Sequence, residues 1–294
     1  MSAPNNPQAA ATIVVATLAG AAMAWAGSDG GDRVGEIPVF ALCGALAFAI
    51  NWLVFIPSAL GRTERYYDLT GGLTYISVTV VAVLLSRGLD LRASFVAAMV
   101  LIWALRLATF LFLRIVRAGH DRRFDDLKNR PLRFLMAWTL QGLWVLLTAA
   151  TALVVITGGA RKPLGAVGSA GLAIWAIGML VEVVADRQKS RFRADPANEG
   201  AFIDVGLWAW SRHPNYFGEI VLWTGMAIVA VPVLEGWQWA ALISPVFVAF
   251  LLIKVSGIPM LEEKANERWG GQERYEEYKR HTPVLIPRPP GRQR

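Results

Sequence analysis

Nine consecutive residues, Ser-Arg-His-Pro-Asn-Tyr-Phe-Gly-Glu at 211–219, form the densest group of side chains in this chain that could do chemistry. They supply a cation, an imidazole, an amide, a phenol and a carboxylate, and an apolar stretch follows directly. Because proline suits the first turn of a helix, we expect a helix to begin near Pro214. Asn215 and Glu219 would then share one helical face. A helix N-terminus with Arg212 beside it suits an anionic ligand such as a nucleotide.

A second group of reactive side chains lies between residues 63 and 72, where Tyr66, Tyr67 and Asp68 follow one another. One interpretation is a solvated loop whose Asp or Thr caps the next helix. The other is a lid that turns a phenol and a carboxylate toward a binding site. The sequence alone leaves both open.

A row of basic residues, Arg106, Arg114 and Arg117, shares one face of a predicted helix with Phe110. Arg106 lies within a predicted membrane span, where an unpaired arginine costs at least ~2.5 kcal/mol, so it needs a partner. Arg114 and Arg117 could anchor the helix end at the membrane surface. Alternatively, the whole row could face a phosphate.

Acidic and basic residues also alternate along 182–193. Glu182 and Asp186 share one helical face, and Lys189 and Arg193 follow. An acid inside a membrane helix indicates a functional site by default, although a structural ion pair with Arg106 or Lys254 would also explain it. This order of charges would suit a nucleotide, because the carboxylate could bind a ribose and the cations that follow could bind phosphates.

The C-terminal stretch contributes a fourth group: Glu262, Glu263, Arg268, Tyr275, Tyr278, Lys279, Arg280 and His281. This stretch resembles an amphipathic surface helix, but its aromatic and basic residues could equally cover a nucleotide. The three histidines, His120, His213 and His281, show no metal-ligand spacing, so we predict no metal site.

The elements that must position these groups are membrane helices. Hydrophobic residues make up 55% of the 294-residue chain and charged residues only 17%, whereas a soluble domain of this length would expose far more charge. We predict an all-α fold, a polytopic membrane bundle of seven or eight helices, from stretches of about 20 apolar residues. The third stretch is the shortest. The predicted spans are 9–26, 38–59, 70–86, 93–113, 133–157, 164–185, 215–233 and 238–259.

The distribution of charge predicts the orientation. Of the 29 lysines and arginines, 22 fall in alternate loops, namely 60–71, 114–133, 186–213 and the tail 261–294. The positive-inside rule then places both termini of a multi-pass membrane protein in the cytoplasm. The net charge of +7 therefore indicates membrane orientation and not nucleic-acid binding. We predict one membrane domain, 1–294, with a cytoplasmic cofactor region mainly within 100–294.

The 211–219 motif resembles the C-terminal signature of the steroid 5-alpha-reductase family, and most closely its bacterial DUF1295 branch. Asp68-Leu69-Thr70-Gly71, the 182–193 segment, the stretch from Arg106 to Phe124 and the pair Tyr275 and Tyr278 support the resemblance. The isoprenylcysteine carboxyl methyltransferases carry a looser Arg-His-Pro-x-Tyr-x-Gly pattern.

The resemblance implies an NADPH-dependent enzyme that transfers a hydride to an activated C=C bond of a lipophilic substrate, steroid-like or isoprenoid. The bacterial branch implies a location in the bacterial inner membrane, with membrane lipids as the surroundings, and we predict no nucleic-acid partner. Candidate catalytic residues are Glu219, Tyr216 and Tyr66, each able to donate a proton or a hydrogen bond. The candidate cofactor-binding residues are Arg106, Arg114, Arg117, Asp186, Lys189, Arg193, Arg212, His213, Asn215 and Tyr278.

Two departures from the animal steroid reductases leave the substrate and the proton donor open. The chain lacks the Gln-Glu-Leu element of the animal steroid reductases, and Trp103 stands where those enzymes have a catalytic tyrosine. The proton donor therefore stays unassigned among Tyr66, Tyr67, Tyr216, Glu182 and Glu219. The alternative activity is an S-adenosylmethionine-dependent methyltransferase, and a non-catalytic lipid-binding membrane protein is the third hypothesis.

Overall fold

The computed structural model describes residues 6–118 and 124–290, without the side chains of 110–118. Almost all of this part is helical, and a two-stranded antiparallel hairpin is the exception, with β1 at Arg33–Val34 and β2 at Ile37–Pro38. The helices are α1 Asn6–Gly27, α2 Val39–Leu60, α3 Tyr67–Leu85, α4 Leu91–Ala118, α5 Pro131–Thr157, α6 Gly165–Ala194, α7 Pro214–Ala230, α8 Ile243–Phe250, α9 Ile258–Trp269 and α10 Glu273–His281.

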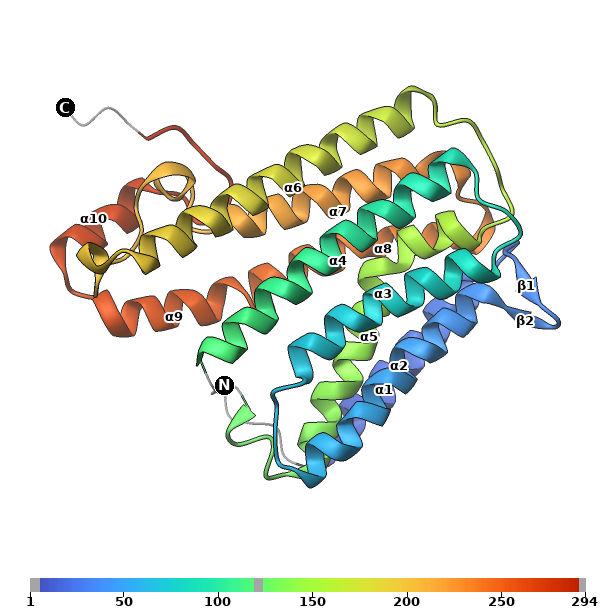
Figure 1. Cartoon of the computed structure of the whole chain (residues 1–294), viewed down its shortest axis with the longest axis horizontal. Coiled ribbons are helices and arrows are strands. Elements are labelled where there is room, and N and C mark those ends of the chain that lie inside the picture. The colour runs from blue at the N-terminus through green and yellow to red at the C-terminus, as the bar shows by residue number, and fades with distance from the viewer. Residues whose placement is uncertain (1–5, 119–123, 291–294) are drawn as a thin grey trace. The chain divides into compact units, whose positions relative to one another are not determined.

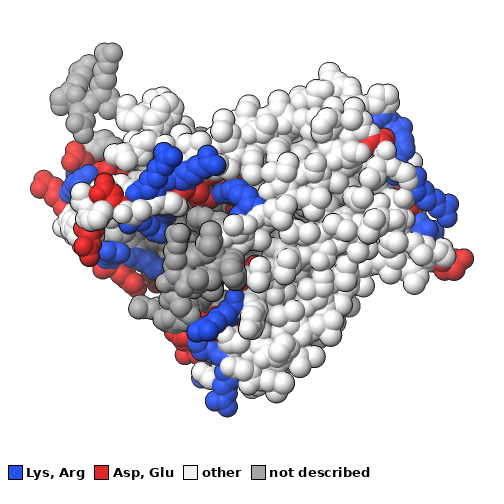
Figure 2. Space-filling view, viewed as in Figure 1, with Lys and Arg blue, Asp and Glu red and all other residues white. Residues whose placement is uncertain are grey.

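Within the described residues, eight helical stretches are long and apolar enough to cross a membrane. The prediction of a polytopic all-α membrane protein is therefore confirmed. The short third span is a helix of 19 residues, Tyr67–Leu85. On the face seen in Figure 2, charged side chains gather where helices end, and the sides of the helices are largely uncharged.

The eighth predicted span, 238–259, is not one continuous helix. A 3-10 segment at Gly236–Leu242 leads into α8, a π-helical turn follows at Leu251–Val255, and the helix breaks before α9. A side chain at Gly257 would lie 2.4 Å from the carbonyl oxygen of Leu252, so only glycine fits this break. The break redirects the chain into α9, which carries part of the candidate site.

The chain divides into two compact units: unit 1 is Met1–Gly168 with Val229–Ser244, and unit 2 is Ser169–Ile228 with Pro245–Arg294. In unit 1, α5 is the most buried span, and α1, α2, α3 and α4 pack around it (Figure 1). Phe134 and Trp138 of α5 are fully buried there. The two rings meet edge to face with centroids 5.9 Å apart, and such packing, together with interhelical hydrogen bonds, holds spans together in lipid, where burial of apolar surface alone gives little.

One buried arginine links three segments of unit 1. Arg92, at the start of α4, is only 1% exposed, and its guanidinium donates to the carbonyl oxygens of Val229, Pro163 and Leu164. The distances to Pro163 and Leu164 are 2.8 and 3.0 Å. The Val229 carbonyl lies in the last turn of α7, where a helix leaves acceptors without a helical donor, and the other two carbonyls lie just before α6.

In unit 2, glycines allow α6 and α7 to pack at backbone distance, and the two helices run side by side in Figure 1. A Cβ on Gly178, Gly218 or Gly225 would lie 2.5–2.6 Å from a backbone nitrogen of the other helix. For Gly218, which belongs to the 211–219 motif, that nitrogen is the one of Glu182. The motif glycine thus serves packing, and it places the start of α7 against the acidic part of α6.

Candidate functional site

Unit 2 contains a cavity of about 250 Å³ whose lining residues come from four separate segments of the chain. The segments are the end of α6, the loop before α7, α9 and α10. Cations and aromatic rings dominate the lining, with one carboxylate among them. The residues used below are Lys189, Arg193, Phe202, Trp208, Arg212, His213, Glu262, Trp269, Tyr275 and Tyr278.

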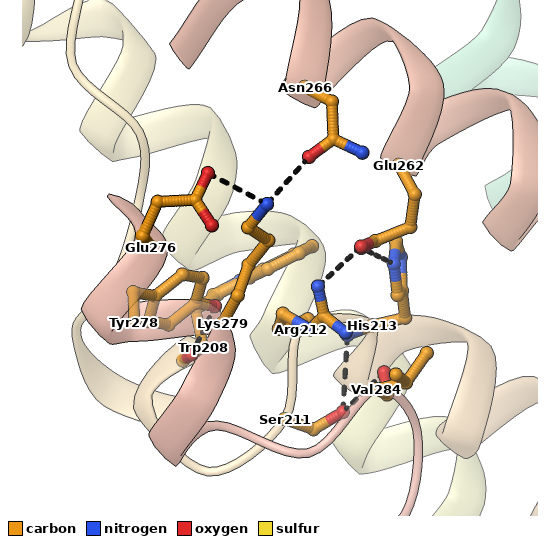
Figure 3. A network of polar contacts seen from close by, with 10 residues as sticks. All are labelled: Trp208, Ser211, Arg212, His213, Glu262, Asn266, Glu276, Tyr278, Lys279 and Val284. Atoms are coloured by element: carbon orange, nitrogen blue, oxygen red, sulfur yellow. Dashed lines mark hydrogen bonds and ion pairs between the residues drawn. The ribbon is translucent and has the colours of Figure 1, made fainter. Parts of the chain in front are cut away.

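Glu262 of α9 holds the start of the motif (Figure 3). One carboxylate oxygen accepts a hydrogen bond from the Arg212 guanidinium, and the other lies 2.7 Å from Nε2 of His213. Ser211 supports the same turn, because its hydroxyl oxygen accepts from the His213 backbone N–H and its hydroxyl donates to the carbonyl of Leu285 at 2.8 Å. The C-terminal segment therefore fixes the loop that presents both site side chains.

The contacts of His213 define its protonation state. Its side chain is only 5% exposed, and an ionised carboxylate only accepts, so Nε2 carries the hydrogen that Glu262 receives. Burial lowers the pKa of His213 below its usual value, against the raising effect of Glu262. Nδ1 is buried and has no hydrogen-bond partner in the described residues. A neutral His213 thus offers a lone pair that a hydroxyl or amide of a ligand could fill.

Asn215 makes a side-chain contact between α7 and α6. Its amide donates to a carboxylate oxygen of Asp186 at 3.3 Å. The carbonyl oxygen of the same side chain is buried, with no hydrogen-bond partner in the described part of the chain. Tyr216, the next residue, stacks its ring on His213 with a centroid distance of 5.6 Å.

Aromatic rings form the wall on the side of α9 and α10. Phe202 packs against Trp269, Tyr275 and Tyr278, with ring centroids 5.2–5.9 Å apart. The hydroxyl of Tyr278 donates to the backbone carbonyl of Trp208 at 2.7 Å (Figure 3). Burial raises the pKa of Tyr278, so its phenol stays neutral and committed to that carbonyl.

The ammonium group of Lys189 lies 4.2 Å from the centre of the Trp208 ring. Since an ammonium over an indole gains a cation–π interaction, this contact holds the lysine at the cavity without using up a carboxylate. The cavity therefore keeps a surplus of positive charge over the single Glu262 carboxylate.

The predicted cofactor-binding residues divide between the two units. Lys189, Arg193, Arg212, His213 and Tyr278 line the cavity of unit 2. Asp186 and Asn215 bond to each other in that unit, and Glu219 is half-buried one helical turn beyond Asn215. Two predicted residues, Tyr66 and Arg106, belong to unit 1, where Tyr66 is 53% exposed and Arg106 is half-buried. The side chains of Arg114 and Arg117 lie outside the described residues.

Sequence reasoning missed three important site residues. Glu262 was placed in the C-terminal group without a role, and Phe202 and Trp208 were not singled out at all. A signal was present, because two large aromatics in a charged loop between membrane spans have no obvious partner unless another segment covers them. The structure shows that α9 and α10 cover Phe202, and that the Trp208 indole packs against α6, where it donates to the carbonyl of Ala185 at 3.0 Å. Tyr275 is only 3% exposed, so the tail is more than a surface helix.

No cluster of three or more His, Cys, Asp or Glu side chains that could hold a metal ion occurs in the described part of the chain.

Comparisons with known proteins identify a family and several relatives. A family described as "Protein of unknown function (DUF1295)" matches residues 54–282. A 3-oxo-5-alpha-steroid 4-dehydrogenase 1 from Bos taurus is 30% identical over 118 residues, and its counterpart from Macaca fascicularis is 33% identical over the same length. Steroid 5-alpha-reductase DET2 from Arabidopsis thaliana is 26% identical over 119 residues.

Each of these matches covers 40% of this chain and 39–40% of the relative. The matched region thus spans about two fifths of the length of these curated relatives. No solved structure matches the chain significantly.

Proposed function

The chain belongs to the DUF1295 family, which is steroid 5-alpha-reductase-like, and from this premise we propose that it is an NADPH-dependent membrane reductase. Its substrate would be a lipophilic molecule, steroid-like or isoprenoid, with a C=C bond activated by a carbonyl group. One observation carries the proposal: five residues predicted to bind a cofactor come from three separate segments and line one cavity. The names of the relatives, which are those of steroid reductases, support the reaction class.

The residues of the cavity fit part of a phosphorylated dinucleotide. Lys189, Arg193 and Arg212 would meet phosphate groups, because arginine binds phosphate through paired, charge-assisted hydrogen bonds. The unpartnered Nδ1 of His213 and carbonyl oxygen of Asn215 would accept from ribose hydroxyls or an amide. A cavity of about 250 Å³ is smaller than the ~300–1,000 Å³ of typical ligand sites, so it would hold one portion of the dinucleotide.

Reduction of an enone needs a hydride at the β carbon and a proton at the α carbon, while negative charge develops on the carbonyl oxygen. Bound NADPH would supply the hydride. The protein would orient the reactants, exclude water and provide hydrogen-bond donors for the developing charge. Tyr278 is an unsuitable proton source because its hydroxyl donates to a backbone carbonyl and its pKa is raised. Tyr216, Glu219 and Tyr66 remain the candidate donors.

The proposal is tested with purified full-length protein in detergent, by following the melting temperature as NADPH is added. A ligand that binds only the folded protein raises the melting temperature. We expect NADPH to do so and S-adenosylmethionine not to. Arg193→Gln should weaken half-saturation about tenfold, the effect of losing one charge-assisted hydrogen bond. Arg187→Gln is the matched control, since Arg187 is an exposed arginine of the same helix outside the cavity.

Activity is measured as NADPH oxidation in the presence of lipophilic enones. Asn215→Ala should abolish most of the turnover while the protein remains folded, because it removes both the contact to Asp186 and the free acceptor. Stabilisation by S-adenosylmethionine alone would contradict the proposal. So would unchanged NADPH binding and turnover in both site variants.

A further inference from the structure

A second, larger cavity lies in unit 1, at the place where α1 and α5 begin. Its volume is about 670 Å³, and it is separate from the cofactor residues discussed above. The lining consists of the first residue of α1, the last two residues before α5 and the first turn of α5. These residues are Asn6, Asn129, Arg130, Pro131, Leu132 and Arg133.

Two arginines in this lining have no acidic partner in the described residues. Arg133 is only 8% exposed, and its Nε is buried without a hydrogen-bond partner there; Arg130 is exposed. The nearby Lys128 differs, because it is paired with Glu64 at 3.3 Å and with Asp125 at 3.0 Å. A buried guanidinium with an unused donor is costly, so Arg133 is poised for an anion.

The N-termini of α1 and α5 add a positive electrostatic potential to the charge of the two arginines. α1 and α5 are 22 and 27 residues long, and neither has an acidic residue in its first turn. The residue before α5, Arg130, makes no side-chain capping bond. The N–H groups of Leu132 and Arg133 precede the first intrahelical bond, which Phe134 donates to the carbonyl of Arg130. Such N–H groups point toward an anion placed at the helix end.

The position of the cavity indicates which kind of anion could reach it. Both α1 and α5 are candidate membrane spans, and they pack against each other in unit 1. The start of a spanning helix lies at the level of the lipid headgroups, where phosphate is abundant. We propose that the cavity lined by Arg130 and Arg133 binds a phosphate group, supplied by the headgroup of an anionic lipid or by a free phosphate.

The test uses the purified full-length protein in detergent, with three probes added separately: phosphatidylglycerol, phosphatidylcholine and inorganic phosphate. Half-saturation is read from the rise in melting temperature. We expect phosphatidylglycerol to stabilise the protein, and Arg130→Gln and Arg133→Gln each to weaken half-saturation about tenfold. Arg65→Gln is the control, because Arg65 is an exposed arginine of unit 1 outside the cavity.

The probes also separate the two sources. Stabilisation by phosphatidylglycerol alone identifies a lipid headgroup, whereas an equal effect of inorganic phosphate identifies a free-phosphate site. If Arg133→Gln fails to fold, the exposed Arg130 carries the test alone. Equal stabilisation by phosphatidylcholine and phosphatidylglycerol would overturn the proposal. No stabilisation by any probe, or an effect unchanged in Arg130→Gln, would also overturn it.

Discussion

His213 illustrates how single residues at this site depend on their surroundings. The ring is held by Glu262 on one side and by the Tyr216 ring stacked against it, and it carries one unpartnered nitrogen. A protonated ring would need a partner for the second N–H, and the described residues supply none. The neutral form is therefore the one that the fold stabilises.

This preference predicts a pH dependence of stability. The pKa of His213 is lower in the folded protein than in the unfolded chain, so the unfolded chain binds more protons between the two values. Stability should be fully present above about pH 6.5 and should fall as the pH drops toward the lowered pKa. Melting temperatures measured in steps from about pH 7.5 to 5 should show this decline.

His213→Gln should flatten that part of the pH profile, because glutamine can still donate to Glu262 but does not titrate. His281→Gln serves as control, since His281 is exposed and its ring nitrogen contacts only the backbone of Glu277. An unchanged slope in His213→Gln would show that another group titrates.

At the scale of elements, the contact between α6 and α7 determines whether the site exists. Gly218 gives α7 room to meet the backbone of Glu182, and this packing places Asn215 opposite Asp186. The element start was predictable, because Pro214 is the first residue of α7 as its sequence indicates. The close packing of α6 against α7 could not be predicted, because a glycine in an apolar helix does not indicate which helix it packs against.

Gly218→Ala should therefore destabilise the protein by about 1–3 kcal/mol, because its methyl group would meet backbone and not a flexible side chain. Thermal unfolding measures the effect. Gly44→Ala is the matched control: Gly44 is also a buried helical glycine, but its nearest neighbours would lie at an ordinary 3.4–3.6 Å. A loss no larger than that of the control would contradict the close packing of α6 and α7.

Other elements show where sequence patterns stop being informative. The continuous apolar stretch after Gly236 predicted one span, because hydropathy does not register a π-helical turn or the break at Gly257. The aromatic wall could not be predicted either, because Phe202 and Tyr275 are 73 positions apart in sequence. Conversely, the eight spans followed directly from their lengths, because membrane thickness constrains each span locally.

At the scale of the whole molecule, the distribution of lysine and arginine predicts that alternate loops share one side of the membrane. This can be measured with a Cys43→Ala background, because Cys43 is the single cysteine and is buried. Glu36→Cys and Glu199→Cys would then place one exposed thiol in the hairpin loop and one in the loop after α6.

An impermeant thiol reagent should label Glu36→Cys in intact cells, and Glu199→Cys only after the cells are permeabilised. The Cys43→Ala protein without a new cysteine should stay unlabelled in both conditions. Labelling of both positions in intact cells would mean that the orientation or the number of crossings is wrong.

The hydrogen bonds of Arg92 also affect the order in which the protein assembles during its synthesis. Its acceptor on Val229 lies 137 positions further along the chain. At about 5–20 residues per second, a ribosome needs roughly 7–27 seconds to make that segment. The acceptors on Pro163 and Leu164 follow after 71 and 72 positions, but until Val229 is made the nitrogen that donates to it must rely on lipid headgroups, water or an insertion factor. Nascent chains that pause before α7 is complete would therefore expose a cation that the finished protein conceals.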